Sequence, residues 1–298
     1  MACVIGIDVG GTNTDAVVVK NREILAWTKV TTTKDVTTGV LKAIHGVLAK
    51  LKPQDVTTGV LKAIHGVLAK LKPQELKLQQ INLGTTHFVN SIVQRSPELA
   101  KVGVIRIATK PNTSSVPAFF DFPRDLVQLI DGGYCIVSGG CEFDGSETAS
   151  IAEEEILQEV ENFLKKNVKN LVLISTFATV KSSHEEKAYE IIQKNFGNSI
   201  SCTLSHKIGQ LGFIERENAS ILNESLKPLC QKTLRNFKSA LEKLNLKCPL
   251  FVSQNDGTIV RSNIAIENPV FTFASGPTNS MRGAAFVSGV KDAIVLDI

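Results

Sequence analysis

The sequence predicts an α/β fold with a mixed sheet and flanking helices, and three features lead to this prediction. An apolar strand at 4–9 is followed by a glycine turn and a second apolar run that ends near Val19. Short apolar runs then alternate with amphipathic segments between 81 and 204, as in layered architectures with largely parallel strands. With 43% hydrophobic and 21% charged residues, a chain of 298 residues can bury a full core.

The first hairpin organises the chain. Its strand surrounds one carboxylate, Asp8, with β-branched residues, and Gly10 and Gly11 permit a tight reversal with unhindered backbone N–H groups. An unpaired charge at the end of an apolar strand is costly, so we expect Asp8 to face a metal or a catalytic water. Short side-chain donors suited to phosphate oxygens follow the glycines: Thr12, Asn13 and Thr14. The alternative is an ordinary β-hairpin with a Gly-Gly turn.

A third strand is expected at 23–29, and an exact repeat follows it. Residues 35–54 recur letter for letter as 55–74. Each copy predicts an amphipathic helix with an Asp N-cap and a Pro stop, and Pro53 makes one continuous helix improbable. Identity without divergence indicates a recent tandem duplication, a gene-prediction artefact or an engineered feature. We expect two helices, of which one occupies the position between the third strand and the next.

The remaining elements follow in order. The expected strands are 81–83, 102–108, 171–175 and 200–204, and the expected helices are 86–95, 151–167, 183–195 and 215–244, the last bent near Pro228. A Pro-rich loop or lid is expected at 110–123. The last third holds apolar segments at 250–252, 270–273 and 293–298, a turn at 255–258 and a helix that begins at Ser275-Gly276-Pro277.

Composition and charge exclude several classes of protein. The net charge of +4 is spread without a basic run, so we expect neither nucleic acid nor membrane as a partner. Met1 to Cys3 lead directly into the first strand and no run of eighteen apolar residues occurs, so a cytoplasmic protein is expected.

The six cysteines lack a C-x-x-C pair and are expected as reduced thiols. His87, His184 and His206 lack partners at ligand spacing, so no metal is expected on them.

Four motifs resemble one protein family. Ile5 to Asp15 is similar to the first phosphate loop of the actin, Hsp70 and sugar-kinase superfamily, and Asp15 after Thr14 is similar to hydantoinase A and 5-oxoprolinase proteins in particular. The three later segments that resemble the same family are Gly84–Arg95, Gly139–Gly145, and Ser275–Pro277 together with Gly283–Ala285. The motifs occur in the family's order over nearly the whole chain.

This resemblance implies an actin-like (ribonuclease H-like) ATPase lobe. Residues 1–205 would form the family's N-terminal region, and 206–298 the beginning of its core, which ends before the second phosphate loop. The implied activity is ATP-dependent ring opening of a cyclic amide of the hydantoin or 5-oxoproline type, through phosphorylation of the carbonyl oxygen. ATP and Mg²⁺ are the implied cofactors. The implied partners are the cyclic amide, a hydantoinase B-like subunit or domain, and further copies of the chain in a homo-oligomer.

The resemblance also assigns residues. Asp8 would hold Mg²⁺ and, with Thr86, act in catalysis. The residues that would contact the nucleotide are Gly10, Gly11, Thr12, Asn13, Thr85, Ser275, Gly276 and Pro277. Thr86 has an N-cap as its equal alternative, and Thr278-Asn279-Ser280 departs from the family's usual Ala-Gly-Gly. A sugar kinase of the same superfamily and a catalytically inactive lobe are the alternative functions.

Overall fold

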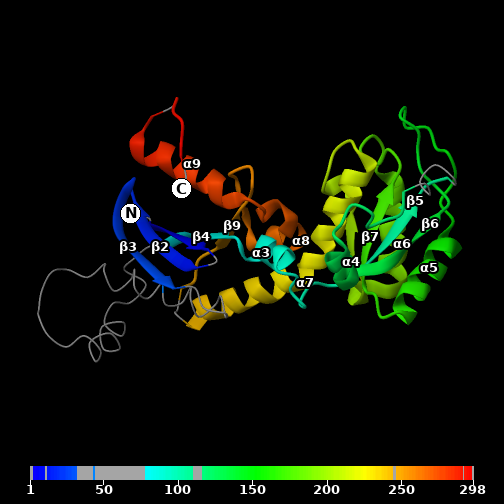
Figure 1. The fold of residues 1–298 in the computed structure, drawn as a ribbon, viewed down its shortest axis with the longest axis horizontal. Coiled ribbons are helices and arrows are strands. Elements are labelled where there is room, and N and C mark those ends of the chain that lie inside the picture. The colour runs from blue at the N-terminus through cyan, green and yellow to red at the C-terminus, as the bar shows by residue number, and fades with distance from the viewer. Residues whose placement is uncertain are drawn as a thin grey trace, which may run out of the picture. The chain divides into compact units, whose positions relative to one another are not determined.

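The computed structural model describes residues 3–10, 12–31, 43, 78–109, 116–243, 246–290 and 292–296. The chain divides into two compact units, unit 1 from Met1–Asn90 and Cys230–Ile298 and unit 2 from Ser91–Leu229 (Figure 1). These divisions fall inside two helices, α3 (His87–Val93) and α7 (Phe213–Lys243). The boundary predicted at 205/206 concerns family segments and stays a prediction. The repeat copies 35–54 and 55–74 lie outside the described residues except for Ala43, which is helical and buried.

Unit 1 contains a six-stranded mixed sheet in the order β10-β9-β4-β1-β2-β3. β1 and β2, β2 and β3, and β9 and β10 pair antiparallel, whereas β4 is parallel to β1 and to β9. The strands are β1 (Cys3–Val9), β2 (Asn13–Lys20), β3 (Glu23–Thr31), β4 (Leu78–Thr85), β9 (Leu250–Ser253) and β10 (Ile259–Arg261). The predicted hairpin and third strand are therefore confirmed.

Alternation decides which face of this sheet is buried. Ile5, Ile7 and Val9 of β1 are buried, while the residues between them are less so, as the two-residue period of a strand requires. Figure 1 shows α9 (Ser275–Ser288) and the C-terminal part of α7 on opposite sides of these strands. A short helix, α8 (Ser262–Glu267), and a 3₁₀ turn at Pro269–Thr272 precede α9.

Two surfaces of unit 1 are apolar and exposed. Trp27 in β3 is the only tryptophan of the chain, and 62% of its surface is accessible. In α9 every residue from Met281 onward is exposed, including Phe286 and Val287. Arg22 lies over the ring of Phe286, with its guanidinium carbon 5.8 Å from the ring centroid.

Unit 2 contains a four-stranded, wholly parallel sheet in the order β6-β5-β7-β8. Its strands are β5 (Val102–Ile107), β6 (Asp131–Val137), β7 (Asn170–Ser175) and β8 (Ser201–Leu204), connected through α4 (Arg124–Ile130), α5 (Glu153–Lys165) and α6 (Ser183–Phe196). All six residues of β5 are buried, because a central parallel strand is covered on both faces. Ile156, Val160 and Phe163 of α5 pack with Ile191 and Ile192 of α6 in its core.

The structure departs from the predicted elements at several places. α4, β6, β10 and α8 are additional, and most of the apolar segment at 270–273 belongs to the 3₁₀ turn at Pro269–Thr272. β6 begins Asp131-Gly132-Gly133, a start with low strand propensity. Gly132 is nonetheless required at this position, because a Cβ on it would lie 2.8 Å from the carbonyl oxygen of Val102. Tertiary packing therefore overrides local propensity at this strand.

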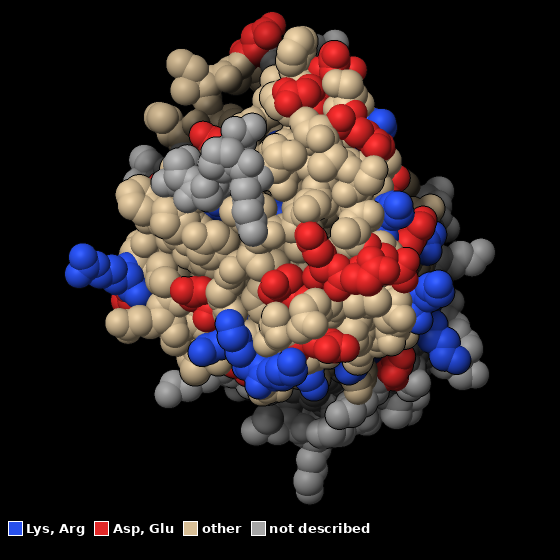
Figure 2. Space-filling view, turned by 90° about the vertical axis from the view of Figure 1, so that its right-hand side faces the viewer, with Lys and Arg blue, Asp and Glu red and all other residues tan. Residues whose placement is uncertain are grey.

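Charge on the face in Figure 2 is mixed, with a group of acidic side chains across its middle and basic side chains gathered below them. A single-sign field of the kind that attracts polyanions is therefore not a feature of this face. In the part of the chain that the structure describes, no helix has the length and apolarity needed to cross a bilayer.

Candidate functional site

The carboxyl end of β1 lies in a row of four paired residues, three of them polar, across four strands of unit 1. We call it the polar row. Asp8 pairs with Asp15 of β2 and with Gly84 of β4, and Asp15 pairs in turn with Lys29 of β3. Directly opposed residues of antiparallel strands place their side chains on one face, so Asp8 and Asp15 share a face. The Lys29 ammonium lies 3.6 Å from the Asp15 carboxylate, and Asp8 is exposed. The row therefore presents two neighbouring carboxylates with one cation at its end.

Helix α9 contributes an amide to the same place. A Cβ added to Gly84 would lie 2.9 Å from Nδ2 of Asn279 and 3.1 Å from Oδ1 of Asp8. The two side chains thus converge over the one residue in the row that has no side chain of its own. Thr278 anchors this turn of α9 by donating its hydroxyl to the carbonyl oxygen of Asn255, at 2.8 Å.

The glycine turn joins β1 to β2 as predicted. The Gly10 N–H donates to the carbonyl oxygen of Asn13 at 2.9 Å, which closes the turn. Thr12 at its tip is exposed, and Asn13 is partly buried as the first residue of β2. Gly11 lies outside the described residues. The turn follows Asp8 by two residues, so these side chains and amides adjoin the polar row.

Thr85 and Thr86 end β4 and lead into α3, and both hydroxyls contact protein groups. Thr85 accepts a hydrogen bond from the N–H of His87 at 3.0 Å and is buried. Thr86 donates its hydroxyl to the carbonyl oxygen of Val9 at 3.4 Å and accepts from the amide of Asn90 at 3.2 Å. Its own N–H also donates to Val9, at 3.1 Å. These contacts fasten the end of β4 to the end of β1.

Ser275, Gly276 and Pro277 form the first turn of α9, as expected. Ala274 before them has φ of 55°, a left-handed conformation that turns the chain into the helix. Ser275 is buried, Gly276 is partly buried and Pro277 is exposed. A Cβ on Gly276 would have no described atom within 4 Å, so close packing does not explain this glycine. The structure brings the first turns of α9 to Gly84 through Asn279, two residues past Pro277.

Two residues of this site were missed as ligand candidates from sequence. Asp15 served only to distinguish the family, although the six residue pairs between β1 and β2 place it opposite Asp8. Asn279 lay in a segment that departs from the family's small residues, and that departure was the available signal. Its side-chain amide provides an oxygen and a nitrogen next to the Asp8 carboxylate.

Replacement of Gly84 by alanine tests this convergence. We expect the added methyl to displace Asn279 or Asp8 and to lower the free energy of unfolding by about 1 to 3 kcal/mol. Asn279→Ala in the same background should recover most of the loss, measured by urea titration. Gly283→Ala, in α9 and without described atoms near its added Cβ, is the control and should be neutral or slightly stabilising.

Unit 2 contains a second set of polar residues, in its interior. Arg106 of β5 donates from Nε and Nη2 to the two carboxylate oxygens of Glu217 in α7, at 2.6 and 2.7 Å. Both side chains are fully buried, and Nη1 also donates to the carbonyl oxygen of Val116 at 2.7 Å. The guanidinium carbon lies 5.2 Å from the ring centroid of Tyr134 and 5.5 Å from that of Phe213. The ion pair thus connects the central strand to the start of α7.

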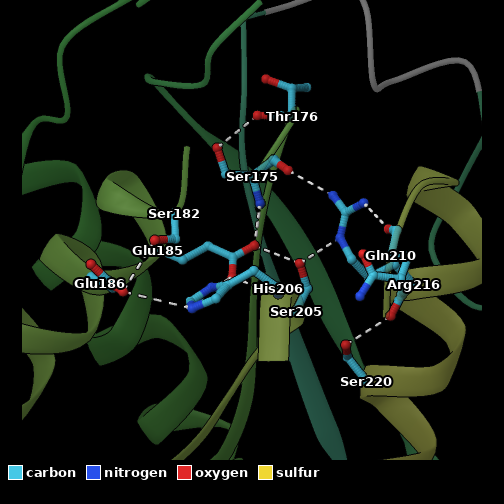
Figure 3. A network of polar contacts seen from close by, with 10 residues as sticks. All are labelled: Ser175, Thr176, Ser182, Glu185, Glu186, Ser205, His206, Gln210, Arg216 and Ser220. Carbon is cyan, nitrogen blue, oxygen red and sulfur yellow. Dashed lines mark hydrogen bonds and ion pairs between the residues drawn. The ribbon is translucent and has the colours of Figure 1, made fainter. Parts of the chain in front are cut away.

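A buried carboxylate, Glu185, organises the network drawn in Figure 3. It accepts from the Ser175 N–H at 2.9 Å, the Ser205 hydroxyl at 2.5 Å and the His206 N–H at 3.0 Å. Ser205 in turn accepts from Nε of Arg216 at 2.9 Å. The network therefore joins the ends of β7 and β8 to the first turns of α6 and α7.

Two histidines have carboxylate neighbours that their sequence spacing did not indicate. His206 Nδ1 lies 2.6 Å from Glu185 and its Nε2 lies 3.7 Å from Glu186. His184 Nδ1 accepts from the Gly140 N–H at 2.8 Å, so its Nε2 carries the proton that faces Glu147 at 3.4 Å. Among the described residues, no three His, Cys, Asp or Glu side chains are grouped so that they could hold a metal ion.

Comparison with known structures supports the fold. The chain superposes on a nucleotide-free structure of acetone carboxylase with a TM-score of 0.69 at 18% identity, and on an ATP-dependent caprolactamase from Pseudomonas jessenii with a TM-score of 0.67 at 19% identity. Each match covers 96% of this chain and 40% of the other. The expected α/β fold with a mixed sheet and flanking helices is confirmed.

Comparison of sequences identifies the family. An uncharacterized protein of Methanocaldococcus jannaschii is 27% identical over 296 residues, which cover 96% of this chain and 40% of that protein. The chain thus spans about two fifths of the length of these relatives. The family model described as the hydantoinase/oxoprolinase N-terminal region matches residues 4–196, and the one described as hydantoinase/oxoprolinase matches residues 216–298. The resemblance found in the motifs is therefore confirmed, and the chain belongs to the hydantoinase/oxoprolinase family.

Proposed function

We propose that the protein with this chain uses ATP to open a cyclic amide, and that unit 1 holds the phosphates and their metal. The carbonyl oxygen of the amide attacks the γ-phosphorus of ATP, and the bond to ADP breaks. Water then adds to the activated carbon, and the ring C–N bond breaks as the nitrogen takes a proton. Hydrolysis of the resulting acyl phosphate releases phosphate and the open-chain product. Membership of the hydantoinase/oxoprolinase family supports this reaction class. The structural relative whose name states an ATP-dependent caprolactamase supports the same choice.

One observation carries the proposal for the site. Asp8 and Asn279 converge over Gly84, and Asp15 lies beside Asp8 on the next strand, close to the turn from Gly10 to Asn13. The Gly10 N–H closes the turn on Asn13, so the exposed Thr12 is a donor that this turn presents to phosphate oxygens, and carboxylates beside it suit a hard cation. The first turn of α9 adds the positive end of a helix to the same place.

The residues present fit Mg²⁺ together with a nucleotide. Mg²⁺ keeps several waters and is bound through one or two carboxylates plus phosphate oxygens, so a full protein cage is not required. When bound, the cation would neutralise charge on the transferring phosphoryl group. Asp8 and Asp15 are the carboxylates that would hold it, and Lys29 balances Asp15 from the next strand.

The chain's own residues then position the phosphates. Gly84 lets the Asp8 and Asn279 side chains approach each other over β4, where a side chain on residue 84 would collide with them. The hydroxyl of Thr86 is directed to Val9 and Asn90, so we assign Thr86 to fixing the ends of β1 and β4. Thr12, exposed at the tip of the turn, is the hydroxyl best placed to reach a phosphate. Such preorganised donors act without reorganisation during the reaction.

Replacement of Asp8 by asparagine tests the proposal. We expect the affinity for ATP in the presence of Mg²⁺, measured by calorimetry, to fall by at least about tenfold, the lower limit for loss of a group that supports a bound metal. Without Mg²⁺ the variant and the parent should bind ATP equally. The melting temperature should change little, because Asp8 is exposed and the substitution removes the repulsion between its carboxylate and that of Asp15.

Glu23→Gln provides the matched control, because this exposed carboxylate lies on the same sheet at the opposite end of β2. It should leave ATP affinity unchanged. Equal ATP affinity for parent and Asp8→Asn with Mg²⁺ present would contradict the proposal. ADP formation that depends on glucose instead of a lactam would favour the sugar kinase, and absence of ATP binding in the parent would favour the inactive lobe.

A further inference from the structure

The strand order of unit 2 defines a place where a ligand site is expected. The chain forms β5 first, passes to β6 on one side of it and then to β7 on the other. The strand order therefore reverses at β5 and β7, whose carboxyl-terminal residues Ile107 and Ser175 pair directly. In open parallel sheets, ligands bind outside the carboxyl ends of the strands at this switch point.

A cavity of about 430 Å³ lies at these strand ends. Thr109 after β5, Cys141 after β6, and Thr176 and Phe177 after β7 line it, together with Phe213 and Arg216 from the start of α7. Sites for small molecules commonly enclose roughly 300 to 1,000 Å³ and are mostly apolar with a few polar groups. All of these residues belong to unit 2, so the cavity is complete within it.

The glycine motif at 139–145, to which the proposed function assigns nothing, forms one wall. Gly140 has φ of 97°, and a Cβ on it would lie 2.3 Å from Oγ1 of Thr176. This close approach lets the Cys141 N–H donate to the same Oγ1 at 3.2 Å. Only glycine permits both the backbone conformation and the approach. The motif therefore holds the loop after β6 against the loop after β7 at the edge of the cavity.

Phe177 forms another wall in a strained conformation. Its φ is 51°, in the left-handed region that a bulky residue rarely adopts, and it remains 39% exposed. Val180 and Lys181 donate their N–H groups to its carbonyl oxygen, at 2.9 and 3.1 Å, and keep the turn in place. Strain of this kind is typical of ligand-binding loops. An aromatic ring held at a cavity by such a turn suits an apolar ligand body.

The charges around the cavity select an uncharged ligand. Among the described residues that line it, Arg216 is the basic residue and Glu142 the acidic one. Arg216 donates from its three nitrogens to Ser205, Gln210 and Ser175, and the Glu185 and Glu217 carboxylates oppose its charge. Burial raises the pKa of the Cys141 thiol, which keeps it neutral. An anion would find no uncompensated cation among these groups, and Glu142 would repel it.

We propose that this cavity of unit 2 binds the ring of an uncharged cyclic amide, with the ring against Phe177 and Phe213. The choice of a lactam rests on the proposed function, whereas the position of the site rests on the cavity and the strand order. An amide ring has the required combination of an apolar body and a carbonyl that accepts hydrogen bonds. The carbonyl would take a donor from the threonine hydroxyls of the lining, of which Thr109 and Thr176 lie at the ends of the central strands.

Binding of ε-caprolactam to the chain without ATP tests the proposal. In ¹H–¹⁵N correlation spectra we expect saturable shifts of amide signals in the loops after β5, β6 and β7 and at the start of α7. Phe177→Ala should weaken binding by about tenfold, which corresponds to about 1.4 kcal/mol, because the ring wall is lost. Leu211→Ala, at a lining residue that is 78% exposed, should also weaken binding and does not threaten the fold.

Phe120→Ala is the matched control, since this phenylalanine is 72% exposed and lies outside the cavity lining. It should leave binding unchanged, and 5-oxoprolinate, a charged lactam, should bind more weakly than ε-caprolactam. Absence of saturable binding, shifts confined to other regions, or an affinity unchanged from the parent in both Phe177→Ala and Leu211→Ala would overturn the proposal. Such results would leave the Asp8→Asn effect on ATP binding intact, so the two proposals fail separately.

Discussion

Replacing Glu217 with glutamine is expected to lower the free energy of unfolding by about 3 to 5 kcal/mol. Both oxygens of Glu217 accept from Arg106, and both side chains are fully buried. Glutamine would keep the shape of the side chain and remove its charge, which takes the Glu217 counterion away from the buried Arg106 guanidinium. The cost of one uncompensated buried charge exceeds that of most single substitutions. Urea titration followed by far-ultraviolet circular dichroism measures the loss.

Glu215→Gln is the control, because Glu215 lies two residues earlier in α7 and is exposed. It should change stability by no more than about 0.5 kcal/mol. The double replacement Arg106→Met with Glu217→Leu should recover much of the loss, since two apolar residues of similar volume need no mutual compensation. A loss below about 1 kcal/mol for Glu217→Gln would mean that water or another group compensates Arg106.

Replacing Glu185 with glutamine is expected to destabilise the protein by about 3 kcal/mol or more, because several donors share this carboxylate. The N–H groups of Ser175 and His206 and the hydroxyl of Ser205 all point to it. A side-chain amide supplies one oxygen and one NH₂ group, so at least one of these buried donors would face another donor. Burial lowers the pKa of Arg216, and the Glu185 charge opposes that shift. The glutamine variant would lose this attraction between Glu185 and Arg216.

The neighbouring residue offers a matched comparison. Glu186 follows Glu185 in α6, is 53% exposed, and lies 3.7 Å from His206. Glu186→Gln should cost well under about 1 kcal/mol, as for other exposed ion pairs. Equal stability of the two variants in thermal and urea unfolding would contradict the central position assigned to Glu185.

The first hairpin was predictable because its strands are local and strongly patterned. Ile5, Ile7 and Val9 alternate with less apolar residues, and the glycine turn fixes the register. The same local information could not reveal β6, whose Gly132 is needed because a Cβ there would lie 2.8 Å from the carbonyl oxygen of Val102 and 2.9 Å from the side chain of Val168. Contacts between residues distant in sequence decide such an element.

The candidate site was predictable in part for the same reason. Asp8 and the turn after it are contiguous in sequence, so their chemistry could be inferred together. Asn279 lies almost two hundred residues after Gly84, and only the packing of α9 on β4 brings them together. The buried pair of Arg106 and Glu217 is separated by 111 residues. Charged residues in a sequence give no sign of whether tertiary structure will bury and pair them.

The exposed Trp27 has a consequence for how the molecule is observed. It is the one tryptophan of the chain and belongs to unit 1, whereas both tyrosines, Tyr134 and Tyr189, belong to unit 2. Tryptophan emission therefore reports on the surroundings of β3 in unit 1. It does not report directly on the Arg106 and Glu185 contacts, which lie in unit 2. Near-ultraviolet signals from the two tyrosines arise in unit 2, where the centroid of the Tyr134 ring lies 5.2 Å from the guanidinium carbon of Arg106. One denaturation followed at both chromophores would separate the melting of the two units spectroscopically.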